Sequence, residues 1–315
     1  MSKIYPLLFI LFASHAAISQ NAIIRDNELV VNPYPVSPSY TGNQAQHEFF
    51  ASYINHFAGV AGAPNSAWAN YNGHLTKGFG IGGSFRFDQA GAIRKYRIDI
   101  SAAYHAKIGN GHKLSAGWGV NVSTISIDFS NSNSDPINDP QLNSQTLQNG
   151  LAFNANLGLT YTYKTFGITI AAPALIPMAK SGNLFLLTQP LHLRAHSFYD
   201  IRVGRKLSIK PQVALDYILK SPINYNAIVS VKYANLVWVN AGFGAQNIIS
   251  AGLGTCISGR FSIQYTFKHG LNTLSNKGFG SHEICMGVLI GKPNNSSNTT
   301  SIFIKTSKIP YHDWE

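Results

Sequence analysis

Residues 151–163 read LAFNANLGLTYTY, and this stretch decides the fold because apolar and polar side chains alternate along it. The apolar or aromatic positions are Leu151, Phe153, Ala155, Leu157, Leu159, Tyr161 and Tyr163. The positions between them are Ala152, Asn154, Asn156, Gly158, Thr160 and Thr162. A period of two places each set on its own face of a β-strand. An apolar outer face and a polar inner face are typical of a strand in a transmembrane β-barrel.

The composition fits a membrane barrel. Of the 315 residues, 12% are charged, about half of the roughly 25% that is usual in soluble domains, and 45% are hydrophobic. No run of 18 apolar residues follows the N-terminus, which excludes ordinary transmembrane helices. The many Gly (28), Tyr (15) and Phe (18) residues fit a barrel with aromatic girdles. They also fit a large β-sandwich, so composition alone leaves both folds open.

Fourteen segments have strand-like patterns, and the connections between them alternate between short and long. The segments lie near residues 47–56, 65–74, 77–87, 94–107, 111–128, 149–163, 165–173, 191–203, 206–219, 222–233, 235–243, 246–256, 259–268 and 280–290. The long connections include residues 129–148, 174–190 and 269–279. Outer-membrane barrels have tight periplasmic turns and longer outer loops. We therefore expect an all-β fold, a transmembrane antiparallel β-barrel of the outer membrane with about 14 strands; 12 or 16 strands stay open.

The N-terminus is typical of an export signal. Lys3 supplies a positive charge, an apolar core follows, and the small residues Ala17 and Ser19 precede a cut before Gln20. Residues 1–19 are therefore predicted to be a signal peptide.

Two further segments lie outside the expected barrel, which covers residues 47–291. Residues 20–46 contain three prolines and predict an extended lead-in, either periplasmic or lumenal. Residues 292–315 form a C-terminal tail, interpreted either as a disordered extension or as a short adhesive segment, since its end is too apolar for a pure linker.

The formal net charge is +11. The basic residues are scattered among turns and form no run, which argues against nucleic acid as a partner. Loops near anionic lipid headgroups carry such an excess of Lys and Arg. Attraction of an anionic partner by the field of the whole protein is the second interpretation.

No motif of catalysis, cofactor binding or metal binding stands out. HExxH, Walker and GxSxG motifs do not occur. The GFGIGG sequence at residues 78–83 lies inside a strand pattern with no helix after it, so we expect its glycines to relieve crowding or permit curvature. Ser281 and Glu283 share one face of a strand while His282 takes the other, which separates a base from its nucleophile. We expect no catalytic, cofactor-binding or metal site, no cofactor and no enzyme activity.

The alternation also predicts which polar side chains face the lumen. They are Arg97, Asp99, Lys210, Gln212, Asp216, Lys232, Gln264, Lys268 and Glu283. Charges inside a barrel must be hydrated or paired. These side chains form either a selective pore or a set of ion pairs that fills the interior. A barrel of about 14 strands can be either open or plugged.

The alternation places both cysteines, Cys256 and Cys285, on the inward face of their predicted strands. One further strand lies between these two strands. Their backbones are then about 9–10 Å apart. That separation exceeds the roughly 7 Å limit between Cα atoms for a disulfide. We expect two free thiols.

A series of short motifs resembles the PorP/SprF family of outer-membrane proteins, which belong to the type IX secretion and gliding machinery of Bacteroidetes. The matching pieces, between about Val36 and Gly291, are SPSYTG at 37–42, NHFAG at 55–59, GAP at 62–64, NDP at 138–140, Lys210-Pro211 and GSHEI at 280–284. Their order and spacing carry the resemblance. The chain departs from the family pattern at Ser37, at Phe57 and in its C-terminal tail.

The resemblance implies a non-enzymatic protein of the bacterial outer membrane. Its partners would be a large type IX-secreted surface protein, such as an adhesin, periplasmic components of the secretion machine, and outer-membrane lipid. Loops 129–148 and 174–190 are then the expected outer contact surface, because they are long and lie on one side. The alternative is a passive, porin-like channel that prefers anions. An outer-membrane enzyme would need a constellation at the rim that the sequence does not show.

Overall fold

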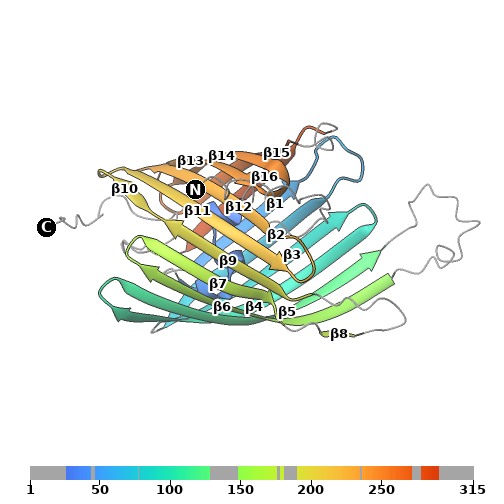
Figure 1. Ribbon diagram of the computed structural model, residues 1–315, viewed down its shortest axis with the longest axis horizontal. Helices are drawn as coiled ribbons and strands as arrows, with labels where there is room; N and C mark the ends of the chain where they lie inside the picture. Colours follow the sequence, from blue (N-terminus) through green and yellow to red (C-terminus); the bar gives the residue numbers. More distant parts are fainter. Residues whose placement is uncertain are drawn as a thin grey trace, which may run out of the picture.

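A computed structural model shows a closed antiparallel β-barrel of 14 strands (Figure 1). It describes residues 26–43, 47–76, 78–127, 148–175, 178–180, 190–234, 236–271 and 278–290. The strands of the closed sheet are β1 (His47–Asn55), β2 (Asn65–Thr76), β3 (Phe79–Ala90), β4 (Ile93–Gly109), β5 (His112–Ile127), β6 (Gln148–Tyr163), β7 (Phe166–Ala174), β9 (His192–Tyr199), β10 (Ile201–Val203), β11 (Leu207–Ile218), β12 (Asn224–Tyr233), β13 (Val237–Gly244), β14 (Ile248–Ile257), β15 (Phe261–Gly270) and β16 (Ser281–Ile290).

Each strand pairs with its neighbours in the chain, and the ring closes between the first and the last strand. β1 pairs with β16 from His47↔Ile290 to Asn55↔His282. β9 and β10 are two pieces of one barrel strand, because both pair with β11 and only Asp200 lies between them. The short strand β8 (Met178–Lys180) pairs with β6 outside this path. The expected fold and strand count are confirmed, with boundaries that differ by a few residues.

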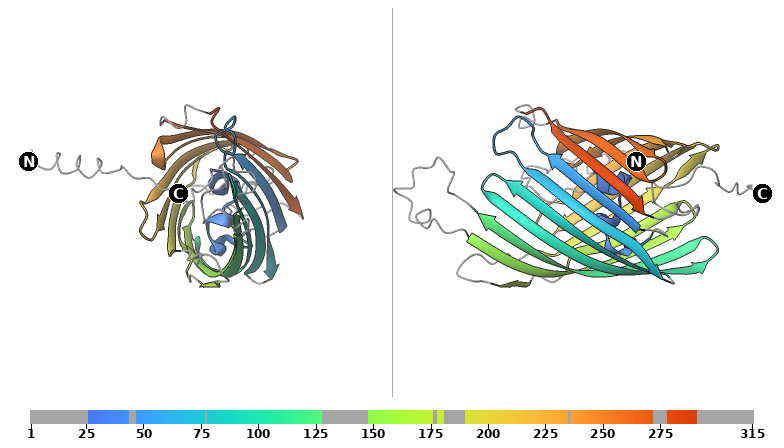
Figure 2. Two further views of the ribbon diagram at one scale, coloured as in Figure 1. Left: turned by 90° about the vertical axis from the view of Figure 1, so that its right-hand side faces the viewer. Right: turned by 180° about the vertical axis from the view of Figure 1, so that it is seen from behind.

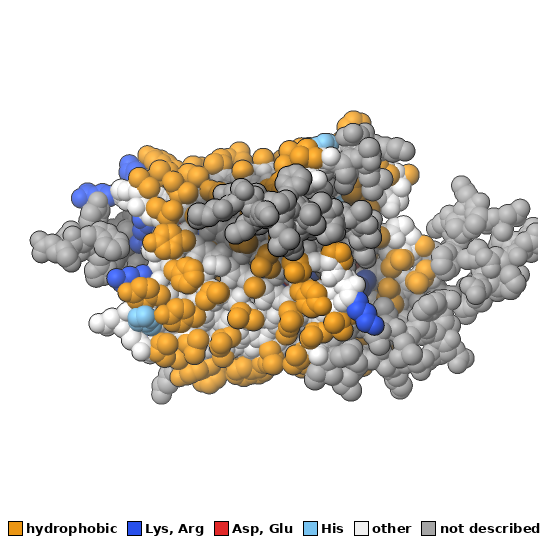
Figure 3. Space-filling model, viewed as in Figure 1, with side chains coloured by type: hydrophobic (Ala, Val, Ile, Leu, Met, Phe, Trp, Pro, Cys, Tyr) orange, Lys and Arg blue, Asp and Glu red, His pale blue; other side chains and the backbone are white. Residues whose placement is uncertain are grey.

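Apolar side chains cover the outside of the barrel and polar ones turn inward. On β6, Phe153 and Leu157 are 46% and 47% exposed, whereas Asn154 and Asn156 are buried. Figure 3 shows hydrophobic side chains spread over the visible side of the barrel. Apolar side chains of this kind can face the hydrocarbon of a bilayer. The closed ring also leaves no strand edge with unpaired backbone groups inside the membrane.

Tight turns gather at one end of the barrel, where β1 begins and β16 ends. Several of these turns require positive φ, which Lys164 (49°), Ala234 (51°) and Ser258 (55°) adopt without being glycine. The opposite end carries the longer connections, but two short ones also lie there, Gly91-Ala92 and the 3₁₀ turn η3 (Ala245–Asn247). The expected alternation of short and long connections therefore holds in part.

The segment before the first strand differs from our expectation of an extended lead-in. Residues 26–43 contain the helix α2 (Asp26–Val30) and the 3₁₀ turns η1 (Tyr34–Val36) and η2 (Pro38–Tyr40). Proline is common at the first position of a helical turn, and both 3₁₀ turns carry one at their start. In the described part of the chain, no helix is long and apolar enough to cross a membrane.

Several expectations concern residues outside the described ranges. They include the signal peptide at 1–19, nearly all of the proposed contact loop at 129–148, most of the one at 174–190, and the C-terminal tail at 292–315.

A charge placed on the outer face near the middle of a strand tests this orientation. We expect Leu157→Lys to destabilise the barrel by about 2–4 kcal/mol, because the ammonium group then enters hydrocarbon. Leu219→Lys, just beyond the end of β11, serves as the matched control and should cost about 0–1 kcal/mol. Equilibrium unfolding in lipid vesicles measures both values. Equal costs for the two variants would contradict the orientation.

Candidate functional site

The lumen contains the segment 26–43, which we call the plug. Figure 2 (left) looks along the barrel and shows the short helices of this segment inside the ring of strands. Most of its side chains are buried: Asp26, Glu28, Leu29, Val30, Val31, Asn32, Tyr34, Val36, Ser37, Pro38, Ser39, Tyr40 and Thr41. The plug crosses the width of the lumen, because its two halves contact opposite parts of the wall.

One anchor of the plug is apolar. Leu29, Val30, Val31 and Val36 belong to a buried cluster with wall residues that point inward. The wall contributes Phe50, Trp68, Ala214, Ile228, Trp238, Cys256, Cys285 and Leu289. Burial of one aliphatic side chain contributes about 1.5–3 kcal/mol. The cluster explains Ile228, which interrupts the otherwise polar inner row of β12.

The beginning of the plug is held by charge. Asp26 Oδ1 accepts a hydrogen bond from Asn226 Nδ2 at 3.0 Å and lies 3.3 Å from Lys268 Nζ. The same ammonium lies 3.2 Å from Glu283 Oε2, so one lysine joins the plug to β15 and β16. Two residues further on, Glu28 Oε1 pairs with Arg86 Nη2 of β3 at 2.8 Å.

The second half of the plug is held by a chain of hydroxyl groups. Ser39 Oγ lies 2.6 Å from Thr160 Oγ1, which lies 2.8 Å from Thr169 Oγ1. The Tyr40 hydroxyl lies 2.8 Å from Thr169 Oγ1 and 3.1 Å from His196 Nδ1. Burial raises the pKa of Tyr40 to about 12, so its phenol stays protonated at neutral pH. These contacts join η2 to β6, β7 and β9.

Wall side chains also satisfy carbonyl groups of the plug that helical bonds leave unpaired. Arg194 Nη1 donates to Pro35 O at 3.2 Å and to Val36 O at 3.4 Å. Its Nε donates to Asp216 Oδ1 at 2.7 Å, which fixes the guanidinium. His105 Nε2 lies 2.8 Å from Thr41 O. A buried carbonyl without a partner costs free energy, so these bonds permit an irregular backbone inside the barrel.

Four wall glycines provide the space in which the plug lies. A Cβ atom at Gly117 would overlap the backbone of Pro38, and one at Gly158 would overlap Ser37 Oγ. On β3, a Cβ at Gly80 would overlap Thr41 O, and one at Gly82 would come within 2.8 Å of the Tyr34 ring. The GFGIGG stretch begins in the turn before β3 with Gly78, and its other residues lie in that strand, where the lumenal Gly80 and Gly82 leave room for the plug.

The structure places the nine predicted lumenal side chains inside the barrel. Ion pairs involve Arg97 with Asp99, Asp216 with Arg194, and Lys268 with Glu283. Two lysines instead lie over aromatic rings. Lys210 Nζ is 4.4 Å from the centroid of the Phe198 ring, and Lys232 Nζ is 6.0 Å from that of Trp238.

Sequence reasoning left a lumenal position of this segment open, but it missed the folded conformation of the plug and two of its wall partners, Arg86 and Arg194. Two signals pointed to it. One is the apolar Ile228 in a polar inner row. The other is the pair of carboxylates, Asp26 and Glu28, just before a barrel whose lumenal positions include several lysines. Neither pattern has a periodicity that would identify a buried segment.

The geometry offers no catalytic arrangement at the tested motif. Ser281 and Glu283 face inward, whereas His282 faces outward, where its Nδ1 lies 2.6 Å from the Tyr265 hydroxyl. Within the described ranges, no group of three His, Cys, Asp or Glu side chains is placed to hold a metal ion. Cys256 and Cys285 are buried and form no disulfide with each other, and β15 lies between their strands.

Comparison with known proteins identifies a family and supports the fold. A family model described as "Type IX secretion system membrane protein PorP/SprF" matches residues 20–288. The CymD monoaromatic hydrocarbon channel is similar in structure, with a TM-score of 0.50 and 12% identity over 86% of this chain and 94% of that one. The toluene transporter TbuX of Ralstonia pickettii has a TM-score of 0.49 and 11% identity over 81% of this chain and 92% of that one. No match was found among curated proteins.

At 12% identity, the CymD structure shows the fold alone. The family match and the apolar outer surface of the closed barrel place this protein in the outer membrane.

A single methyl group tests the glycine contacts. We expect Gly117→Ala to loosen the plug, because the new Cβ occupies the position of the Pro38 backbone. Hydrogen exchange at the amides of residues 34–41 should accelerate at least tenfold. Gly83→Ala is the matched control, since its Cβ meets only Asp99 O, at an ordinary 3.5 Å, and it should leave the plug unchanged. Equal exchange rates in both variants would contradict the proposed contact.

Removal of the shared lysine tests the charged anchor. Lys268→Met leaves Asp26 and Glu283 buried together without their cation. We expect a loss of about 3–5 kcal/mol in the free energy of unfolding. Adding Asp26→Asn should restore part of that loss, because one of the two buried charges disappears. A cost below about 1 kcal/mol for Lys268→Met would show that the anchor is exposed to water.

Proposed function

Because the chain belongs to the PorP/SprF family of type IX secretion system membrane proteins, we propose that it is a non-enzymatic outer-membrane barrel that supports the secretion or surface attachment of a large secreted protein. The proposed partner is an adhesin-like surface protein. Contacts with periplasmic components of the secretion machine form the second part of the proposal.

The single observation that carries this proposal is the plug across the lumen. It is bonded to strands on both sides through Lys268, Arg86 and Arg194, and wall glycines fit its backbone. A solute or a polypeptide in transit would have to displace this segment. The rims of the barrel, rather than its lumen, are therefore the favoured contact surfaces for partners.

The short-turn rim has the charge expected of such a surface. Its exposed basic side chains are Lys107, Lys164, Arg202, Arg205, Lys206 and Arg260. Figure 3 shows Lys and Arg side chains gathered at this end of the barrel. Short turns face the periplasm in outer-membrane barrels. A basic rim there attracts acidic protein surfaces and speeds their association.

The competing function is a passive, anion-preferring channel. The lumenal Lys210 and Lys232 favour it, because each places an ammonium group inside the barrel over an aromatic ring. It requires the plug to leave the lumen or to shift aside. The two functions therefore differ in the conductance of the intact protein.

Two measurements on the full chain separate them. In a planar bilayer, we expect the wild-type barrel to show little steady conductance, and Gly117→Ala to show more because it loosens the plug. In mild detergent, the wild type should co-purify with a large secreted protein, identified by mass spectrometry. A steady anion-selective current together with the absence of any such partner would overturn the proposal.

Charge reversal at the rim tests the periplasmic contact. Arg205 and Lys206 lie in an exposed turn of this rim. The double variant Arg205→Glu with Lys206→Glu should weaken the capture of periplasmic components of the secretion machine at least tenfold, because the rim would then repel an acidic partner. Arg94→Glu, exposed near the opposite end of β4, is the control and should leave capture unchanged. Equal capture by both variants would show that the basic rim makes no such contact.

A further inference from the structure

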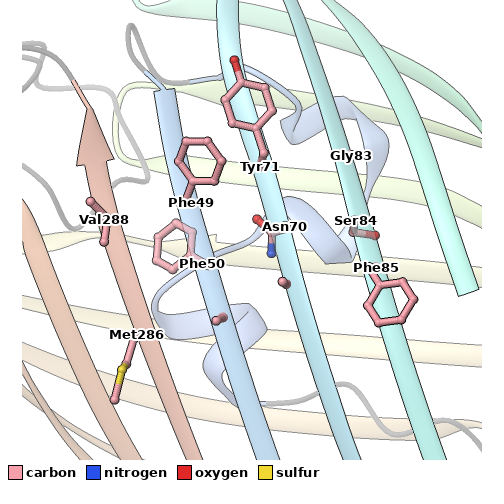
Figure 4. A pocket seen from close by; sticks show the side chains of 11 residues that line it. Phe49, Phe50, Asn70, Tyr71, Gly83, Ser84, Phe85, Met286 and Val288 are labelled. Carbon is pink, nitrogen blue, oxygen red and sulfur yellow. The ribbon is translucent and has the colours of Figure 1, made fainter. Parts of the chain in front are cut away.

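The outer wall has a hollow near the seam where the last strand meets the first. It has a volume of about 550 Å³ and extends over β16, β1, β2 and β3 (Figure 4). Its floor is made of small residues: Ala51 lies directly opposite Ala69 across β1 and β2, and Gly83 follows on β3. Its volume lies in the range of pockets that hold small ligands, roughly 300–1,000 Å³.

Large apolar side chains border this floor. Phe49 and Phe85 rise on the β1 and β3 sides, and Met286 and Val288 on the β16 side. Phe49, Phe85 and Met286 are among the exposed apolar side chains of the outer surface. The hollow is therefore continuous with the surface that meets hydrocarbon, and its natural contents are apolar.

The lining of the hollow is almost wholly apolar, and a polar pair of side chains lies beside it, next to its lining residue Tyr71. His47 Nδ1 lies 2.7 Å from the Tyr71 hydroxyl, and the two rings are stacked with centroids 5.9 Å apart. The Phe49 ring packs against the same Tyr71 ring, with 4.8 Å between the two ring centroids. His47 is the first residue of β1, so this pair lies toward the short-turn end, where aromatic girdles mark the level of the lipid headgroups.

We propose that this hollow binds one phospholipid of the leaflet at the short-turn end. One acyl chain lies along Ala51, Ala69 and Gly83, where the small side chains let it approach the backbone. The headgroup lies beside His47 and Tyr71. When the Tyr71 hydroxyl donates to His47 Nδ1, the imidazole carries its proton on Nε2, which donates to a phosphate or ester oxygen of the lipid.

The choice of a lipid rather than a protein segment rests on the apolar floor and on the polar pair beside it. A strand from a partner would find no unpaired backbone groups here, because β1 is paired with both β16 and β2 along its length. An amphipathic molecule matches both the apolar floor and the polar pair beside it.

The test uses the full-length barrel and a defined lipid. The protein is reconstituted in vesicles of phosphatidylethanolamine, extracted into mild detergent and analysed by native mass spectrometry. We expect one retained phospholipid on the wild type. Ala51→Leu with Ala69→Leu fills the floor and should lower the lipid-bound fraction at least fivefold. His47→Ala removes the headgroup contact and should lower it by a smaller factor.

A second pair of alanines provides the matched control. Ala241 and Ala251 also lie opposite each other on the outer wall, across β13 and β14, away from the hollow. The double leucine variant at these positions should retain the lipid like the wild type. Equal lipid retention by both double variants would overturn the proposal. So would a photo-crosslinker at Ala69 that captures a protein and no lipid in native membranes.

Discussion

The structure depends on one constraint: inside a bilayer every backbone N–H and C=O group must find a partner within the protein. A closed antiparallel sheet satisfies this constraint, and the ring here closes through the complete pairing of β1 with β16. Closure assigns two environments to every strand, hydrocarbon outside and an enclosed polar space inside. The two-residue alternation along β6, β11, β12 and β15 is the direct record of this division in the sequence.

A ring of this size leaves an interior that the wall side chains alone do not fill, and the plug occupies part of it. The solution combines three kinds of contact. Aliphatic side chains of α2 share a buried cluster with inward Trp238 and Ile228. The carboxylates of Asp26 and Glu28 reach Lys268 and Arg86, and the Ser39 hydroxyl of η2 reaches Thr160. A mixed set of this kind fixes one position for the segment, because each anchor requires a different part of the wall.

The sequence predicted the barrel well and the candidate site poorly, for a physical reason. A strand between lipid and lumen has a local signature, so the fourteen strands and the lumenal side of Lys210, Asp216 and Glu283 follow from neighbouring residues. The plug has no such signature. Its prolines suggested an extended chain, whereas its conformation is decided by distant groups such as Asn226, which lies 200 residues from its partner Asp26. Contacts between residues so far apart in the sequence produce no local pattern, and only an exception such as the apolar Ile228 in a polar inner row indicates them.

The position of the plug in the chain has a consequence for biogenesis. The segment precedes all of the strands, yet Asp26 contacts β12 and β15, which come late in the chain, and Lys268 links it to Glu283 on β16. A finished cylinder gives it no sideways route inward, because every seam of the wall is hydrogen-bonded. The segment therefore reaches its place either while the sheet curls or along the axis of the finished cylinder. In both cases its contacts with Asn226 and Lys268 form only after those late strands have been made, so the N-terminal segment is among the last parts of the interior to be fixed.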